Sequence, residues 1–202
     1  VLDERPELSP DAPRRQADLG RFPLDRMGAD PARVAEAAAL LAGAERPVVI
    51  AGGGVHASGA VAELGALQDM GLPVATTVMG KGAVAETHPL SLGVVGYFMA
   101  PGSRSSHHRA LIEEADVVLL IGNRTNQNGT DSWQLYPRNA RFIHIDIDGG
   151  EIGRSYEALR LKGDAKLTLS ALTEALAGQD RGTIDARRPD LEARIAEGRR
   201  AH

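Results

Sequence analysis

The sequence predicts an α/β protein with a doubly wound, mostly parallel sheet of the Rossmann-like type, covered by helices on both faces. Two observations predict this fold. Short segments rich in Val, Ile and Leu alternate with segments whose apolar residues recur every three or four positions. Aromatic residues make up only 3% of the 202 residues, so the core must consist of aliphatic side chains. Such a core is typical of parallel strands buried on both faces.

The first predicted helix follows an extended N-terminal segment. Residues 1–29 contain several prolines among mixed charges, so we expect a linker laid over a surface. Asp30 and Pro31 then form a helix start, with a carboxylate at the N-cap and a proline suited to the first turn. The helix is expected to end near Gly43, and its apolar face consists of Val34, Ala37, Ala38 and Leu41.

Strands and helices then alternate along the chain. The predicted strands are the apolar segments 47–51, 73–76, 116–121 and 141–147. Ser58 is expected to cap a helix that extends to Met70, and residues 103–114 are expected to form another. A further helix is predicted from Ala165 to Leu176, with Asp164 as its capping residue.

The C-terminal segment differs in composition. Residues 178–202 are charged and have no strand pattern, but Leu191 and Ile195 lie four positions apart and predict a weakly amphipathic helix. We expect a linker toward another domain, and a functional tail remains the alternative. The predicted division is therefore a linker at 1–29 from a preceding N-terminal domain, a central nucleotide-binding-type domain at 30–177 and a charged linker or helix at 178–202.

Composition excludes several classes of function. The formal net charge of −4 gives no basic surface for nucleic acid. The chain has no cysteine, so disulfides, a thiolate nucleophile and thiolate metal sites are excluded. No apolar segment reaches membrane-spanning length, and the first residues do not follow the pattern of a signal peptide. We expect a cytoplasmic protein that binds neither nucleic acid nor membrane.

The candidate binding site is the sheet edge where the strands end, because open α/β sheets bind ligands there. Each predicted strand ends in a polar or glycine-rich loop. Glycines allow backbone amides to approach a phosphate, and Arg124 is a candidate for binding a pyrophosphate. The loops are residues 52–54, 76–82, 122–127 and 146–148.

The first loop matches a dinucleotide fingerprint in form. Gly52, Gly54 and Ala57 have G-x-G-x-x-A spacing after a strand. A dehydrogenase of the usual type also needs an acidic residue after the second strand, and Thr76 and Thr77 stand there instead. A simple NAD dehydrogenase is therefore disfavoured, and the alternative remains open that the glycines only form a tight turn.

Other candidate residues give weaker signals. His107 and His108 are adjacent, so on a helix they point in different directions and make a poor metal pair. His144 lies within an apolar strand and is predicted to be a hydrogen-bonded core residue. Asp146 and Asp148 face one side of a strand end, where they are candidates to bind a cation or ribose hydroxyls; Asp148 is equally a candidate to cap the turn that follows.

Five stretches together resemble the central domain of the acetohydroxyacid (acetolactate) synthase branch of thiamine-diphosphate-dependent enzymes. The resemblance covers roughly Pro31 to Leu176. It implies a six-stranded parallel sheet in the middle of three α/β domains, and a site for FAD or another adenine nucleotide. The stretches are RPVVIAGGG at 46–54, LPVATTVMGKG at 72–82, HPLSLG at 88–93, ADVVLLIGNR at 115–124 and HIDID at 144–148.

The resemblance also implies a transferase or lyase that acts on a 2-oxo acid such as pyruvate. Thiamine diphosphate is the electron sink of that reaction. The N- and C-terminal domains of the same chain would supply the activating glutamate and the site for diphosphate and Mg²⁺. No Gly-Asp-Gly magnesium motif occurs here, so we expect no catalytic or metal-binding residue in this chain and no activity of the chain alone. The full enzyme is expected to be a homo-oligomer. The alternative is a self-contained nucleotide- or flavin-binding module.

By resemblance, one set of residues would line the nucleotide groove. Flavin-binding members usually have an aromatic residue and two aspartates after the arginine, whereas Thr125, Asn126 and Gln127 follow it here. FAD, ADP, coenzyme A and a degenerate site therefore all remain open. The implied residues are Gly52, Gly53, Thr77, Val78, Met79, Gly93, Arg124, Asp146, Ile147 and Asp164.

Overall fold

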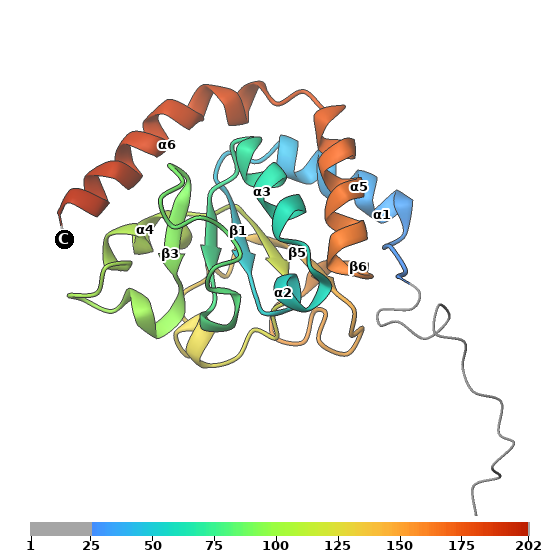
Figure 1. The fold of residues 1–202 in the computed structure, drawn as a ribbon, viewed down its shortest axis with the longest axis horizontal. Coiled ribbons are helices and arrows are strands. Elements are labelled where there is room, and N and C mark those ends of the chain that lie inside the picture. Colours follow the sequence, from blue (N-terminus) through green and yellow to red (C-terminus); the bar gives the residue numbers. More distant parts are fainter. Residues whose placement is uncertain (1–25, 202) are drawn as a thin grey trace, which may run out of the picture.

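The computed structural model describes residues 26–201, and their strands form one six-stranded sheet with helices on both faces (Figure 1). The strand order is β3-β2-β1-β4-β5-β6, and all neighbouring pairs are parallel. The order reverses between β1 and β4, which is the switch point where such sheets bind ligands. The predicted doubly wound fold is confirmed. The strands are β1 (Pro47–Ala51), β2 (Val74–Thr76), β3 (Ser91–Val94), β4 (Val117–Ile121), β5 (Arg141–Asp146) and β6 (Ala158–Lys162).

Two helices begin where Asp30 and Asp164 were predicted to cap them. Asp30 accepts a hydrogen bond from the backbone N–H of Ala32 at 2.8 Å, and Asp164 accepts one from that of Leu167 at 3.2 Å. Short 3-10 turns occupy several loops, namely η1 (Val78–Gly80), η2 (Gly96–Met99), η3 (Ser106–His108) and η4 (Asn128–Thr130). The α-helices are α1 (Pro31–Ala42), α2 (Gly54–Ser58), α3 (Val61–Asp69), α4 (Arg109–Glu113), α5 (Ala165–Ala177) and α6 (Gly182–Arg200).

The core is divided by the sheet into two apolar layers. In β1, Val49 and Ala51 face a layer formed with α1, α3 and α5, whereas Val48 and Ile50 face a layer formed with α4 and α6. Both layers consist mainly of Val, Leu, Ile and Ala, as the low aromatic content predicted. Burial of this aliphatic surface contributes about 25 cal/mol per Å² and is the main force holding the helices to the sheet.

Two helix predictions were wrong in detail. Ser58 does not cap a long helix; it is the last residue of α2, which ends because Gly59 adopts a left-handed conformation with φ 64°. The predicted helix at 103–114 is split into η3 and α4. Its first residues instead form turns in which the Ser103 hydroxyl donates to the Phe98 carbonyl and the Ser106 hydroxyl to the Ser103 carbonyl. Such local serine bonds compete with helix formation.

The structure contains two strands that the sequence pattern did not indicate. β3 has four residues, and its pairing with β2 shifts in register because of an irregularity near Gly93. β6 is an edge strand in which Arg160 and Lys162 are exposed. Short or edge strands have weak alternation of apolar residues, so periodicity alone does not identify them.

The C-terminal helix is longer than predicted. α6 spans 19 residues, includes Pro189 and arches over the sheet edge where the strands begin (Figure 1). Leu191 and Ile195 are buried, so the predicted amphipathic pair is confirmed and lies against the core. Whether α6 leads to a further domain stays a prediction, and most of the predicted linker at 1–29 lies outside the described residues. Within 26–201, no helix is long and apolar enough to cross a membrane.

Candidate functional site

The predicted site residues all lie at or next to the carboxyl ends of the strands. Gly93 and Asp146 lie in the last part of β3 and β5, respectively. The other predicted residues lie in the loops that follow β1, β2, β4, β5 and β6. Because the sheet is parallel throughout, these positions share one edge of the molecule. The edge is the lower one in Figure 1, where α2 follows β1.

The glycines of the first loop are required by contact with the loop after β4. A Cβ atom on Gly52 would lie 2.2 Å from the carbonyl oxygen of Gly122. A Cβ atom on Gly54 would lie 2.6 Å from the Cα atom of Gly122. The interpretation as a tight turn therefore accounts for Gly52 and Gly54 without a ligand. Gly53 is less constrained, since its Cβ would meet the Cβ of Met79 at 3.1 Å. The following helix, α2, has only five residues, so its dipole is small.

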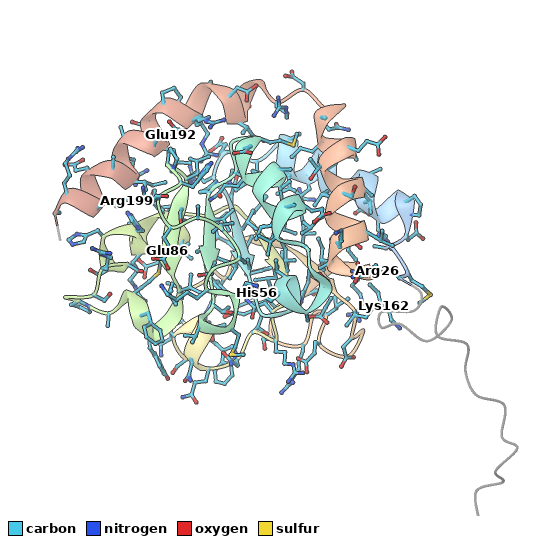
Figure 2. The ribbon with its side chains drawn as sticks, in the orientation of Figure 1. Arg26, His56, Glu86, Lys162, Glu192 and Arg199 are labelled. Atoms are coloured by element: carbon cyan, nitrogen blue, oxygen red, sulfur yellow. The ribbon has the colours of Figure 1, made fainter. Side chains whose placement is uncertain are left out.

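The loop after β2 exposes apolar side chains. Thr77 is buried, and its hydroxyl accepts a hydrogen bond from the Gly80 N–H at 3.1 Å, which fixes the turn η1. Val78 and Met79 consequently lie on the surface, with 50% and 74% of their area exposed. His56, labelled in Figure 2, lies within 3.0 Å of the Lys81 carbonyl and ties α2 to the end of this loop.

Gly93 has a structural role in β3. Its φ of +81° favours glycine, and a Cβ there would lie 2.4 Å from the hydroxyl oxygen of Ser105. That oxygen accepts a hydrogen bond from the Val94 N–H at 3.1 Å. A side chain at position 93 would therefore break the contact between β3 and the loop before α4.

Arg124 is an exposed cation at this edge. Its guanidinium forms neither a hydrogen bond nor an ion pair within residues 26–201. The loop around it is fixed: the Asn123 side-chain oxygen accepts from the Thr125 N–H at 2.9 Å, and the Thr125 hydroxyl donates to Ser155 at 2.9 Å. Arg124 is thus presented to solvent from an ordered loop next to the switch point.

The acidic residues after β5 cap turns. Asp146 accepts a hydrogen bond from the Asp148 N–H at 2.9 Å, and Asp148 accepts one from the Gly150 N–H at 2.8 Å. Asp148 was considered as a ligand-binding residue and as the cap of the following turn, and in the structure it caps that turn. Ile147 lies between them with 62% of its area exposed. No group of three or more His, Cys, Asp or Glu side chains within the described chain is arranged to hold a metal ion.

Asp164 is engaged in the fold as well. Besides capping α5, its carboxylate forms an ion pair with Arg26 at 2.9 Å. Arg26, labelled in Figure 2, also donates to the Ser58 carbonyl at 2.6 Å. This network joins α2, α5 and the segment before α1.

Two of the histidines considered from the sequence, His108 and His144, are buried in the fold. His144 is buried in the core as predicted, and burial lowers its pKa, partly opposed by Asp146. The imidazole is therefore neutral near pH 7, and its Nε2 atom has no hydrogen-bond partner among residues 26–201. His108 lies between two backbone carbonyls, those of Leu92 and Ile195, each at 3.1 Å, and so connects α6 to β3.

Three exposed aromatic side chains at this edge were not predicted from the sequence. Tyr97 and Phe98 follow β3, and Trp133 lies in the loop after β4; they are 42%, 51% and 51% exposed. The indole N–H of Trp133 donates to the Thr125 carbonyl at 2.9 Å, which holds the ring next to the Arg124 loop. Aromatic residues are rare in this chain, and these three lie in loops that follow strands. That combination could have marked them as candidate site residues from the sequence.

Comparisons with known proteins agree with this fold. A family model described as "Thiamine pyrophosphate enzyme, central domain" matches residues 34–172. The protein named "Probable acetolactate synthase large subunit" of Methanocaldococcus jannaschii is 43% identical over 148 residues, which is 72% of this chain and 24% of that protein. The "Sulfoacetaldehyde acetyltransferase" of Castellaniella defragrans is 35% identical over 181 residues. These residues are 86% of this chain and 29% of that protein.

A solved structure shares the fold. It is a Mycobacterium smegmatis protein assigned to the thiamin diphosphate-dependent enzymes, with a TM-score of 0.63 at 22% identity, and the match covers 86% of this chain and 31% of that one. The chain spans about a quarter of the length of the curated relatives it matches.

Proposed function

Because this chain belongs to the thiamine pyrophosphate enzyme family, as its central domain, we propose that it is the nucleotide-binding-type domain of an enzyme similar to acetolactate synthase. The proposed protein is a transferase or lyase that acts on a 2-oxo acid such as pyruvate. Its flanking domains in the same chain would bind thiamine diphosphate and Mg²⁺, and it would work as a homo-oligomer.

One observation supports a nucleotide groove in this domain more than any other. An unpaired, exposed arginine lies at the switch point, and exposed apolar side chains lie on both sides of it along the same edge. Arg124 offers two parallel N–H donors to a diphosphate. Val78, Met79 and Ile147 offer apolar surface to a planar ring, which would remove their exposed area from water.

We propose that the recognised unit is the adenosine diphosphate group, which FAD, ADP and coenzyme A share. The loop after Arg124 has no carboxylate at residues 125–127 and is closed by its own bonds, since the Asn126 side-chain oxygen accepts from the Gly129 N–H at 2.9 Å. A flavin ring would therefore lack acidic contacts from this segment. This favours a nucleotide bound through its diphosphate over one bound through an isoalloxazine.

The residues present do not fit a thiamine diphosphate site. Within residues 26–201 no group of three or more His, Cys, Asp or Glu side chains is arranged to hold the Mg²⁺ that accompanies diphosphate, and His108 and His144 are buried in the core. We therefore assign this domain the tasks of binding and orientation. Thiamine chemistry is assigned to the other domains.

The decisive experiment uses the full-length protein that contains this sequence. With pyruvate, thiamine diphosphate and Mg²⁺, we expect CO₂ release and a condensation product such as acetolactate, whereas the 202-residue chain alone should release none. Turnover by the 202-residue chain, or a complete protein of this length that binds nucleotide without thiamine-dependent turnover, would contradict the proposal. The second outcome would establish the self-contained module instead.

A further inference from the structure

A cavity of about 460 Å³ lies at the opposite edge of the sheet, beneath α6. Pro47 and Pro73, at the starts of β1 and β2, form part of its wall together with Leu111 and Leu191. Its volume is within the range that small-molecule sites occupy. It is separate from the proposed nucleotide groove, because parallel strands place their first residues at the edge opposite their last.

Three arginines line this cavity, and two of them already have partners. Arg46 donates to the Glu114 carbonyl at 2.7 Å and pairs with Glu45 at 3.3 Å, and Arg194 pairs with the Glu114 carboxylate at 3.2 Å. Arg187 lines the same cavity and forms neither a hydrogen bond nor an ion pair within residues 26–201. The cavity wall thus contains one guanidinium without a direct hydrogen bond or ion pair, alongside the carboxylates of Glu45, Glu114 and Asp190.

Arg187 is held in surroundings that do not favour its charge. It is half-buried, and burial lowers its pKa; the charges of Arg46 and Arg194 act in the same direction, while Asp116 and Glu45 oppose them. The Asp116 carboxylate is occupied, since it accepts from the backbone N–H groups of Glu45 and Arg46 at 2.7 and 2.8 Å. Charges of both signs therefore surround Arg187, and burial without a direct hydrogen-bond partner is what makes its charge unfavourable.

We propose that this cavity binds a small multivalent oxyanion, a phosphate or dicarboxylate group, with Arg187 as its principal contact. Guanidinium donors match the oxygens of such groups in a bidentate manner. Arg46 and Arg194 lie at the sides, and the Thr183 hydroxyl in the first turn of α6 provides a further donor. The apolar wall and limited volume select a compact ligand over a polymer.

Anion binding at this place acts on the position of α6. The cavity has walls from both the sheet and α6, so it exists only while α6 lies across the starts of β1 and β2. An anion that bridges Arg46 on one side and Arg187 on the other therefore stabilises the docked helix. Any ligand that binds the folded state alone raises stability, by RT ln(1 + L/Kd) at a free ligand concentration L, so the effect keeps growing with ligand concentration after the site is filled.

The test titrates the full-length protein with inorganic phosphate and, separately, with succinate, at constant ionic strength and with thiamine diphosphate and Mg²⁺ saturating. We expect a saturable heat of binding and a rise in melting temperature with one or both anions. Arg187→Gln should weaken this affinity at least about tenfold, the loss of one charge-assisted bond. In anion-free buffer the same variant should melt no lower than the parent.

A matched variant separates this site from others. Arg200→Gln removes an exposed arginine from the end of the same helix and should leave affinity unchanged. Absence of saturable binding by either anion would overturn the proposal. It would also be overturned if Arg187→Gln lowered the melting temperature in anion-free buffer while affinity stayed the same, because Arg187 would then be a structural residue.

Discussion

Arg26 and Asp164 are 138 positions apart in the chain, and their side chains form an ion pair of 2.9 Å at the first turn of α5. The pair is largely shielded from water, with side-chain exposures of 25% and 11%. It joins the segment before α1 to the end of β6. Asp164 therefore has a role in the fold whether or not it contacts a nucleotide, and this can be separated experimentally from ligand binding.

We expect Arg26→Ala to lower the free energy of unfolding by about 1–3 kcal/mol, because it leaves the buried Asp164 carboxylate without its cation. Urea denaturation measures this change. Arg33→Ala is the matched control, since Arg33 pairs with Glu36 at the surface with exposures of 55% and 54%. A surface pair contributes about 0–1 kcal/mol. Equal effects of the two variants would show that the Arg26 pair is no stronger than a surface pair.

Arg124→Ala in the full-length protein should weaken nucleotide binding by about 1.5–3 kcal/mol, the contribution of a hydrogen bond to a charged group. The melting temperature without ligand should hardly change, because Arg124 is exposed and has no partner among residues 26–201. Calorimetry with ADP and with FAD measures both affinities. Arg138→Ala, an exposed arginine before β5, is the control. Unchanged affinity together with a large loss of stability would mean that the groove is misplaced.

Gly52→Ala should destabilise the protein by more than about 2 kcal/mol or prevent folding, since backbone atoms leave no room for the added methyl group. Gly65→Ala provides the opposite case in α3, where a Cβ would meet nothing within 4 Å. There the substitution should raise stability by about 0.5–1 kcal/mol through helix propensity. Thermal denaturation of both variants compares the two sites. A tolerated Gly52→Ala would argue against the close approach of this loop to Gly122.

The buried His144 predicts a pH dependence of stability. Its pKa is lowered by burial in the folded state, so the unfolded chain binds a proton more readily. Stability is therefore retained above the ordinary histidine pKa of about 6.5 and falls as the pH drops below it, by at most about 1.4 kcal/mol per pH unit. His144→Leu should reduce this slope between pH 7 and 5. Identical slopes for parent and variant would assign the effect to other groups.

The sequence was sufficient where one local signal determined the structure. Asp30 and Asp164 located two helix starts, and the apolar segments located β1, β2, β4 and β5 to within one residue. The sequence was insufficient to predict elements whose conformation depends on tertiary contacts. The shifted pairing of β3, the exposed edge of β6 and the split of the 103–114 segment depend on neighbours distant in sequence.

For the candidate site too, local sequence features could be predicted and tertiary contacts could not. The sequence indicated which edge of the sheet to consider, because loop composition follows directly from strand positions. It could not show that Gly52 and Gly54 closely approach the loop at Gly122, and the predicted contact of Gly52 with a nucleotide stays a prediction. Nor could it show that Arg187 would lie unpaired beneath α6.

The path of α6 has a mechanical consequence. α1 and α5 pack side by side, so without α6 the described chain would begin and end on the same flank, as is common in domains. With 19 residues, α6 extends about 28 Å and moves the C-terminal end to the β3 flank, where Arg199 donates to the Ser91 carbonyl at 2.8 Å (Figure 2). The docked helix thus sets the distance between the two ends of the described chain. Fluorophores at positions 26 and 201 should report a long separation while it is docked and a shorter, broader one when it detaches.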